Sequence, residues 1–282
     1  MKLTSNLLAA SAATLALCLA TPGNADELGD KGREIFKKNQ RAIVTVQVVM
    51  KTKVSMPGQG SESRETKQDI TGTVLDGSGL TVLALSACDP SAMYESMMAG
   101  MASEDMQLKM ETELTDVKVL LDDGTELPSE VVLRDKDLDL AFIRPKSKPA
   151  SPMTAIDLSK ASQAQVLDQV VTLNRLGNAA GRAYSASVER ISAVVQKPRT
   201  FYIPDSTMTS TSLGSPAFTL DGNILGVFVM RTIKSKGGMG MFNFQPDGLT
   251  SIILPAADVL KAAKQAPEKA ADKKSDEKEK KE

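Results

Sequence analysis

Short runs of β-branched and apolar residues, separated by glycine, proline and aspartate, recur along most of this 282-residue chain. Such runs predict β-strands joined by tight turns. A first group lies before Arg144, at Ala42–Val49, Asp69–Leu75, Leu80–Leu85, Asp116–Leu121, Leu127–Leu133 and Leu138–Ile143. A second group follows, at Gln169–Leu173, Ala183–Val195, Ala217–Leu220, Ile224–Met230 and Thr250–Leu254. Many short strands in two groups predict an all-β fold built from two antiparallel barrels.

The proline-rich stretch Pro145–Pro152 separates the two groups and has the composition of a linker between lobes. Amphipathic patterns at Asp26–Gln40 and Pro255–Gln265 predict short helices at the two ends of the folded region. We therefore expect a first lobe over residues 26–145 that includes the N-terminal helix, and a second lobe with its closing helix over residues 146–265.

The N-terminus predicts an export signal over residues 1–25. Lys2 supplies a positive charge, Leu7–Ala20 is an apolar run too short to span a bilayer, and Gly23–Ala25 provides small residues before a cleavage site. An alternative is a lipoprotein anchored at Cys18, but the bulky Leu17 precedes that cysteine. We expect a periplasmic or secreted protein with no membrane span after signal removal.

Charge and cysteine usage narrow the function classes. The formal net charge of -1 gives no electrostatic reason to bind nucleic acid or an anionic membrane. After signal removal only Cys88 remains, so an internal disulfide is excluded. Cys88 lies beside apolar residues and is interpreted as a small buried hydrophobe.

Three segments lack strand character. The stretch 51–68 is polar and is interpreted as a loop, and Ala266–Glu282 is a charged tail predicted to be disordered. A methionine-rich insertion over residues 91–115 predicts a helix that packs against the core or a partner. An alternative is a Cu(I) site, because thioethers bind Cu(I). Its ligands would come from Met93, Met97, Met98, Met101, Met106 and Met110, with Met239 and Met241.

The order of these motifs resembles the HtrA-type branch of the trypsin-like serine proteases, from about Glu27 to Gln265. The matching segments are the hairpin Gly72–Leu83, the strand-turn-strand segment Val117–Leu140 with Asp139–Ala141, the loop Leu213–Ala217 with Asp221–Val227, and Gly248–Pro255. The resemblance implies the chymotrypsin-type fold of two six-stranded antiparallel β-barrels. No PDZ-like module is expected after the barrels.

The resemblance assigns the triad positions to Ser86 for the histidine, Asp139 for the aspartate and Leu213 for the serine. It assigns the oxyanion loop to Thr211 and Gly214. Acyl transfer by this fold needs a hydroxyl nucleophile, an imidazole base and a carboxylate. The whole chain contains no histidine, so no intact catalytic set is expected.

These residues favour an exported pseudoprotease, which is a non-enzymatic scaffold that binds an unidentified polypeptide or protein partner. Cofactors and metals are not expected, because a zinc site would need carboxylates alone. The alternative within hydrolases is a relocated nucleophile, for which Ser212 or Ser215 is preferred and Ser210 is also close. The third hypothesis is the methionine-based Cu(I) protein.

Overall fold

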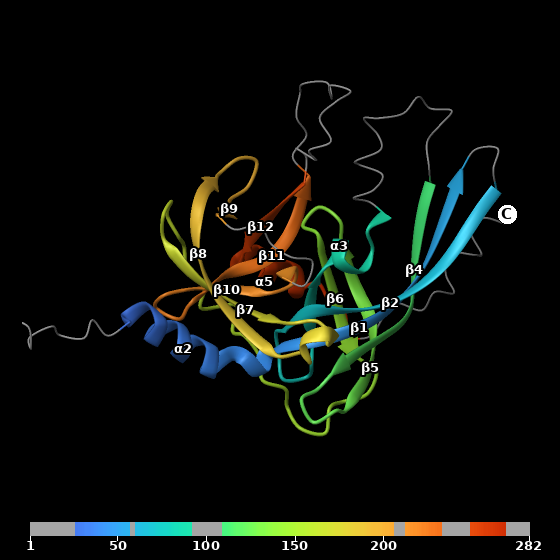
Figure 1. Cartoon of the computed structure of the whole chain (residues 1–282), viewed down its shortest axis with the longest axis horizontal. Coiled ribbons are helices and arrows are strands. Elements are labelled where there is room, and N and C mark those ends of the chain that lie inside the picture. Colours follow the sequence, from blue (N-terminus) through green and yellow to red (C-terminus); the bar gives the residue numbers. More distant parts are fainter. Residues whose placement is uncertain (1–25, 57–59, 92–108, 206–211, 233–248, 269–282) are drawn as a thin grey trace, which may run out of the picture.

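The structure is a computed structural model that describes residues 26–56, 60–91, 109–205, 212–232 and 249–268. It contains two closed, six-stranded antiparallel barrels that lie side by side (Figure 1). Short helices lie at both ends of the folded region. This architecture confirms the predicted all-β class and matches a trypsin-like fold.

The first barrel has the strand order β1-β2-β3-β6-β5-β4. It closes because β1 pairs with β2 on one side and with β4 on the other. The strands are β1 (Ile43–Met56), β2 (Gly60–Val74), β3 (Thr81–Ala84), β4 (Lys109–Leu120), β5 (Glu126–Asp135) and β6 (Leu140–Pro145).

The second barrel has the order β10-β11-β12-β9-β8-β7 and closes between β10 and β7. Its strands are β7 (Gln169–Arg175), β8 (Tyr184–Val195), β9 (Phe201–Pro204), β10 (Pro216–Thr219), β11 (Ile224–Thr232) and β12 (Leu249–Pro255). Sequence reasoning missed β9, because its four residues, which end at Pro204, are too few to show a clear alternation.

Each barrel has its own apolar interior, and a third cluster joins the barrels. Val46, Val48 and Val119 belong to the first interior, and Ile191, Leu225 and Phe228 belong to the second. The joining cluster combines first-barrel residues with second-barrel residues and both terminal helices: Val82, Leu140, Phe142, Leu173, Phe218, Val229, Ile35 and Val259. The two barrels therefore share an apolar interface in addition to their own interiors.

The N-terminal helix α2 (Glu27–Asn39) is capped by Asp26, whose side chain accepts a hydrogen bond from Gly29 N at 3.0 Å. A 3-10 turn, η1 (Gln40–Ala42), then leads into β1. Although α2 precedes the first barrel, it packs on the second, where Phe36 meets the edge of Tyr184 with centroids 6.4 Å apart. The sequence analysis assigned this helix to the first lobe, whereas in the structure it packs on the second barrel.

The remaining helices are short. The helix α3 (Leu85–Cys88) follows β3, η3 (Asn178–Ala180) follows β7, and α5 (Ala256–Ala263) closes the fold. Ala256, Val259 and Ala262 are the buried face of α5. Within the described residues, no helix is both long enough and apolar enough to cross a bilayer.

The predicted loop over residues 51–68 is wrong, because β1 and β2 continue through it as a long hairpin that extends beyond the barrel (Figure 1). The part of this hairpin that extends beyond the barrel, which we call the arm, is polar because it has no core to face. Its strands are held by cross-strand pairs instead, with Lys51 opposite Glu65 on β2 and opposite Glu113 on β4.

Two other boundaries differ from expectation. Residues 109–115 of the predicted helical insertion are part of strand β4, and Met110 pairs with Val54 of β1. The predicted helix over residues 92–108 lies outside the described residues. At the C-terminal end, Ala266 packs against the joining core, and Arg144 Nε donates to the carbonyl of Pro267 at 3.0 Å. Residues 269–282 of the predicted tail lie outside the described residues.

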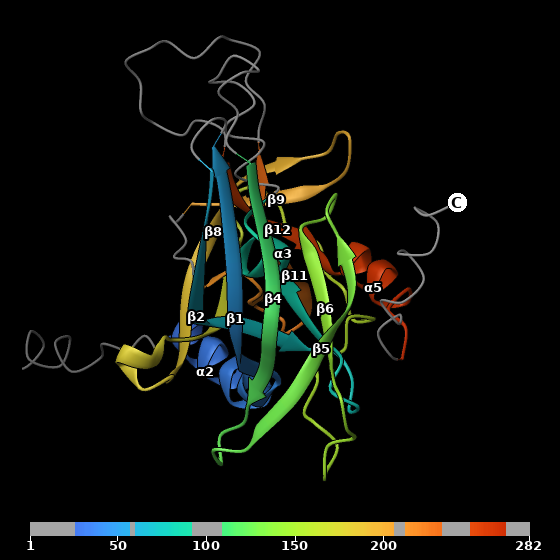
Figure 2. The same ribbon diagram turned by 90° about the vertical axis from the view of Figure 1, so that its right-hand side faces the viewer.

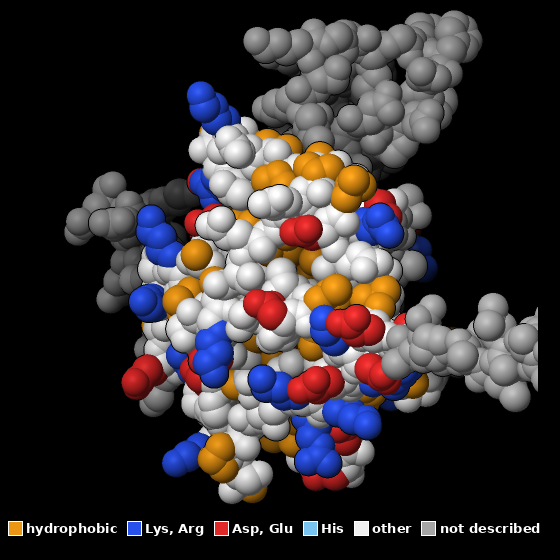
Figure 3. All heavy atoms as spheres, turned by 90° about the vertical axis from the view of Figure 1, so that its left-hand side faces the viewer, with side chains coloured by type: hydrophobic (Ala, Val, Ile, Leu, Met, Phe, Trp, Pro, Cys, Tyr) orange, Lys and Arg blue, Asp and Glu red, His pale blue; other side chains and the backbone are white. Residues whose placement is uncertain are grey.

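The face that carries α2 and β8 shows Lys and Arg side chains interspersed with Asp and Glu (Figure 3). No single-sign field covers this face, in agreement with the nearly balanced charge of the chain.

Candidate functional site

Asp139 stands at the start of β6, at the end of the turn that connects β5 to β6. Its backbone has a left-handed φ of 56°, which aspartate tolerates better than most residues. The carbonyl of Asp139 accepts a hydrogen bond from Leu85 N at 2.9 Å. The turn thus fixes Asp139 against the start of helix α3 in the first barrel.

Ser86 lies in α3 and binds the Asp139 carboxylate twice. Its backbone N–H donates to Oδ1 at 2.7 Å, and its hydroxyl donates to Oδ2 at 2.8 Å. The two residues are half-buried. The structure therefore brings together the predicted histidine and aspartate positions, as expected from the alignment of motifs.

A third donor reaches the carboxylate from the second barrel. The backbone N–H of Met230, on β11, donates to Oδ2 of Asp139 at 2.7 Å. Sequence reasoning missed this contact because a backbone amide has no side-chain signature. The carboxylate consequently joins the two barrels through hydrogen bonds from Ser86 and Met230.

Burial raises the pKa of Asp139 to about 6, and the hydrogen bonds from Met230 and Ser86 oppose that rise. No basic side chain forms an ion pair with Asp139 in the part of the chain that the structure describes. The carboxylate is thus held by neutral donors alone.

Leu213 occupies the predicted nucleophile position, in a turn before β10. Its side chain is buried, with 5% exposed. The next residue, Gly214, has a φ of 87°, and a Cβ there would lie 2.3 Å from the carbonyl oxygen of Thr71. Its carbonyl accepts from the hydroxyl of Thr73 at 2.7 Å. Only glycine fits this close approach of the loop to strand β2.

The two described serines of this loop are buried and bonded. Ser215 is fully buried and Ser212 is 8% exposed. Both approach the side chain of Asn174 on β7: Ser215 Oγ donates to Oδ1 at 3.4 Å, and Nδ2 donates to Ser212 Oγ at 3.5 Å. The hydroxyl of Thr71 also donates to Asn174 Oδ1, at 2.9 Å. Asn174 was not predicted, although a polar residue at the end of a buried strand was a usable signal.

Other predicted positions lie outside the described residues. These are Thr211 of the oxyanion loop, Ser210, and every methionine of the proposed copper set except Met110. Among the described residues, no group of three His, Cys, Asp or Glu side chains is placed to hold a metal ion.

Cys88 ends helix α3, two residues after Ser86. It is fully buried, and burial raises the pKa of its thiol to about 12. The thiolate is the reactive form of cysteine, so this thiol is inert at neutral pH. The structure agrees with the interpretation of Cys88 as a small core hydrophobe.

A separate polar cluster, also missed by sequence reasoning, pins the barrels together. Arg175 on β7 is 8% exposed and lies 3.0 Å from Asp122, in the turn between β4 and β5. Its guanidinium also stacks over the ring of Tyr184 at 4.0 Å, and the Tyr184 hydroxyl donates to Asp122. This cluster links β7 and β8 of the second barrel to the turn between β4 and β5 of the first.

The sequence matches known protease families over parts of its length. Residues 99–227, just under half of the chain, match the family model described as "Trypsin-like peptidase domain". That segment contains Asp139, Leu213 and Gly214 and begins after Ser86.

Three curated relatives match this chain at low sequence identity, and each is named as a protease. The chain is 28% identical to a "Probable periplasmic serine endoprotease DegP-like" of Halomonas elongata over 45% of this chain and 26% of that protein. It is 28% identical to a protein of the same name from Bartonella henselae, over 55% and 29%. It is also 28% identical to "Putative protease Do-like 14" of Arabidopsis thaliana, over 49% and 32%.

The chain thus spans about a quarter to a third of the length of the curated relatives that it matches. The match to the peptidase domain agrees with the two closed barrels. This chain has the fold of trypsin-like peptidases and a weak sequence homology to the HtrA/DegP serine endoproteases.

Proposed function

We propose that this chain is an exported pseudoprotease: a trypsin-like protein that does not catalyse hydrolysis and acts by binding polypeptide. The observation that carries the proposal is the double hydrogen bond from Ser86 to Asp139. In an active triad, the carboxylate holds an imidazole that removes a proton from the nucleophile. Here the chain has no histidine, and the Asp139 carboxylate is bound by a serine instead.

The nucleophile position supports the same proposal. Leu213 has no hydroxyl, and its side chain is buried beside Ser212 and Ser215. A relocated nucleophile would need a hydroxyl exposed to substrate and a base within hydrogen-bond reach. Ser215 is fully buried and donates to an amide oxygen, which is a poor base. These features favour the inactive scaffold over the relocated nucleophile.

Export and polypeptide binding rest on the similarity to relatives and on the N-terminal pattern. Two of the relatives carry the word "periplasmic" in their names, and the chain begins with a pattern typical of a signal peptide. Proteases of this fold act on polypeptides, and loss of the catalytic groups removes the reaction while leaving a surface that can bind chains.

The catalytic half of the proposal is tested with purified protein of residues 26–282. We expect no hydrolysis of fluorescein-labelled casein above the rate of a mock purification, and no adduct with a serine-reactive phosphonate by intact-mass spectrometry. An adduct that maps to Ser210, Ser212 or Ser215, together with turnover lost on alanine substitution of that serine, would replace the pseudoprotease with the relocated nucleophile.

The binding half is tested separately with a permanently unfolded chain, reduced and carboxymethylated α-lactalbumin. We expect saturable binding by fluorescence anisotropy to the 26–282 protein and none to the native, disulfide-bonded α-lactalbumin. Equal binding to the two forms, or to neither, contradicts a role in recognising extended polypeptide.

A further inference from the structure

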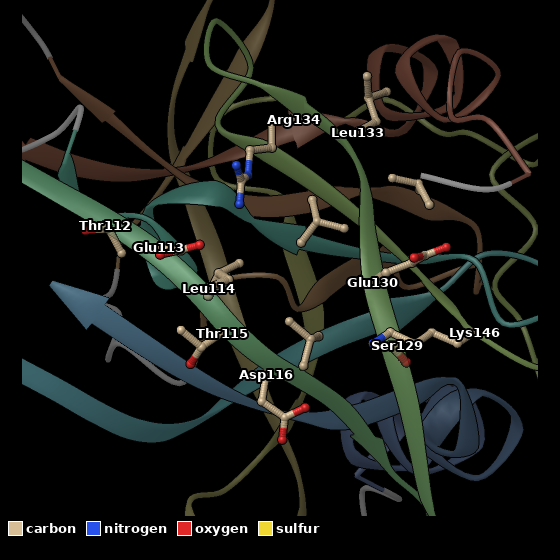
Figure 4. A pocket seen from close by; sticks show the side chains of 13 residues that line it. Thr112, Glu113, Leu114, Thr115, Asp116, Ser129, Glu130, Leu133, Arg134 and Lys146 are labelled. Atoms are coloured by element: carbon tan, nitrogen blue, oxygen red, sulfur yellow. The ribbon is translucent and has the colours of Figure 1, made fainter. Parts of the chain in front are cut away.

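The strands β4 and β5 stop pairing partway along their length. Their ladder consists of Lys118 opposite Pro128, Val119 opposite Leu127 and Leu120 opposite Glu126. Beyond it the strands diverge (Figure 2) and border a groove of about 590 Å³. The groove is lined mainly by residues 112–117 of β4 and 129–134 of β5 (Figure 4). These are the residues that would continue the ladder if the strands stayed together. We call this groove the seam.

Backbone irregularities on the two strands hold the seam open. Thr115 is an extra residue in the pairing of β4 with β1, and its hydroxyl donates to the carbonyl of Val49 at 3.2 Å. Val132 is an extra residue in the pairing of β5 with β6. Such bulges bend a strand and increase its local twist. Pro128 then ends the ladder, because it has no N–H to donate.

Each strand is paired on one side only along the seam. Apart from the bulged Thr115 and Val132, residues 112–117 of β4 pair with β1, and residues 129–135 of β5 pair with β6. Within the described residues, no strand pairs along the seam with the edge of β4 that points away from β1 or with the edge of β5 that points away from β6. These two edges face each other across the groove. Unpaired edges of this kind are templates for an added strand. An extended chain in the seam would meet backbone donors and acceptors on one or both sides.

The side chains of the seam indicate the composition of the strand that fits. Leu114 and Val131 pack against the interior of the first barrel and give the groove an apolar floor. At its rim, Arg134 and Lys146 are exposed, and neither forms an ion pair within the described ranges. Arg134 extends from β5 toward β4 (Figure 4).

The carboxylates that border the seam are already engaged. Asp116 lies 3.4 Å from the ammonium group of Lys118, and Glu113 and Glu130 also have partners. Lys118 is shared with Glu126, which lies 3.1 Å away, so the carboxylates of the seam are not fully neutralised. Arg134 and Lys146 are the lining cations that form no ion pair within the described residues, and they are the groups that a ligand carboxylate can contact. A chain that alternates apolar residues toward the floor with acidic residues toward the rim complements both features.

We propose that the seam binds an extended, acidic segment of another polypeptide by β-strand addition between β4 and β5. The site lies on the first barrel, and its lining includes neither Asp139 nor Leu213. It rests on the proposed function only in taking the partner to be a polypeptide, and it does not depend on whether the chain is catalytically inactive.

The test uses the 26–282 protein and a fluorescein-labelled peptide with blocked ends, of sequence EVTVEVTVE. We expect saturable binding by fluorescence anisotropy. A peptide with the same side chains and methylated alternate backbone nitrogens, and the basic peptide KVTVKVTVK, should each bind at least about tenfold more weakly. The double variant Arg134→Glu with Lys146→Glu should weaken binding of the acidic peptide by a similar factor. Lys197→Glu, an exposed cation on the second barrel, is the matched control and should leave binding within about twofold.

Hydrogen exchange locates the contact. With the acidic peptide bound, amides of residues 112–117 and 129–134 should gain protection, because an added strand satisfies them. Absence of saturable binding, equal binding of the methylated peptide, insensitivity to the double charge reversal, or protection confined to the second barrel each overturns the proposal. These results are read independently of casein hydrolysis, so failure of the seam and failure of the pseudoprotease are distinguishable.

Discussion

The Ser86 hydroxyl lies 2.8 Å from Oδ2 of Asp139, at the position that the resemblance to trypsin-like proteases assigns to the triad histidine. The serine donates to the carboxylate from its backbone as well, so both carboxylate oxygens have a partner from one residue. A buried carboxylate needs donors whether or not it catalyses a reaction. Ser86 therefore satisfies part of the hydrogen-bonding requirement of the Asp139 carboxylate.

Replacing Ser86 with alanine removes one of the donors to the carboxylate. We expect the free energy of unfolding to fall by about 1.5–3 kcal/mol, as for other hydrogen bonds to charged groups. Urea denaturation at pH 7 measures this change. Ser159→Ala is the matched control, because the Ser159 hydroxyl also binds a carboxylate, at 2.6 Å on Asp157, but is exposed to solvent. Equal losses of unfolding free energy in the two variants would show that the hydrogen bond of Ser86 stabilises the fold no more than an exposed one does.

The raised pKa of Asp139 predicts a pH dependence of stability. The folded protein holds the proton up to about pH 6, whereas the unfolded chain releases it near the ordinary aspartate pKa of 3.8. Between these values the folded state binds more protons, so the free energy of unfolding contributed by this group falls as pH rises from about 4 to 6 and is constant above that window.

Asp139→Asn measures that contribution. The difference in free energy of unfolding between the wild type and this variant should decrease by up to about 3 kcal/mol from pH 4 to pH 6.5. Urea titrations at half-unit pH steps provide the curve. A difference that stays flat, or that increases with pH, would mean that the three donors outweigh burial.

Gly214 should be intolerant of a side chain for two reasons. Its φ is 87°, and an added Cβ would lie 2.3 Å from the backbone of Thr71. We expect Gly214→Ala to destabilise the fold by more than about 3 kcal/mol, since a left-handed alanine alone costs about 1–2 kcal/mol. Gly124→Ala separates the cost of the left-handed backbone from the cost of the steric clash, because Gly124 has a similar φ of 83° with no atom within 4 Å of the added Cβ. In thermal unfolding, Gly214→Ala should lower the melting temperature more than Gly124→Ala does.

Restoring the triad should require more than one substitution. Leu213→Ser alone should give no casein hydrolysis, because a serine without a base is a weak nucleophile and general-base assistance contributes about 10² to 10⁴ in rate. Adding Ser86→His supplies the nominal set and should give at most slight activity. A triple variant that also carries Thr211→Gly should be more active, because each oxyanion donor is worth about 10² to 10³ in rate.

The rescue series needs a control for damage to the fold. Each variant should be compared by thermal unfolding, and the triple variant should also be made with Asp139→Asn, which should abolish the gain. Activity that appears with Leu213→Ser alone would mean that another group in this chain serves as a base.

The sequence by itself determined the all-β class, the two groups of strands and the absence of any imidazole. These properties are local or compositional: alternation along a strand is set by neighbouring residues, and the lack of histidine is a count. The prediction of a loop over residues 51–68 failed at the arm of β1 and β2. Strands beyond the barrel have no face toward the core and therefore no alternation of apolar residues.

Only the tertiary structure decided which distant groups meet at the site. The contact of Ser86 with Asp139 spans 53 positions, and that of Met230 with Asp139 spans 91. The packing of α2 on the second barrel and the pairing of Arg175 with Asp122 also join segments far apart in the chain. Backbone donors and open strand edges have no sequence signature, because every residue except proline carries the same amide. Closure of the two barrels selects which of those amides face Asp139 and which are left unpaired along the seam.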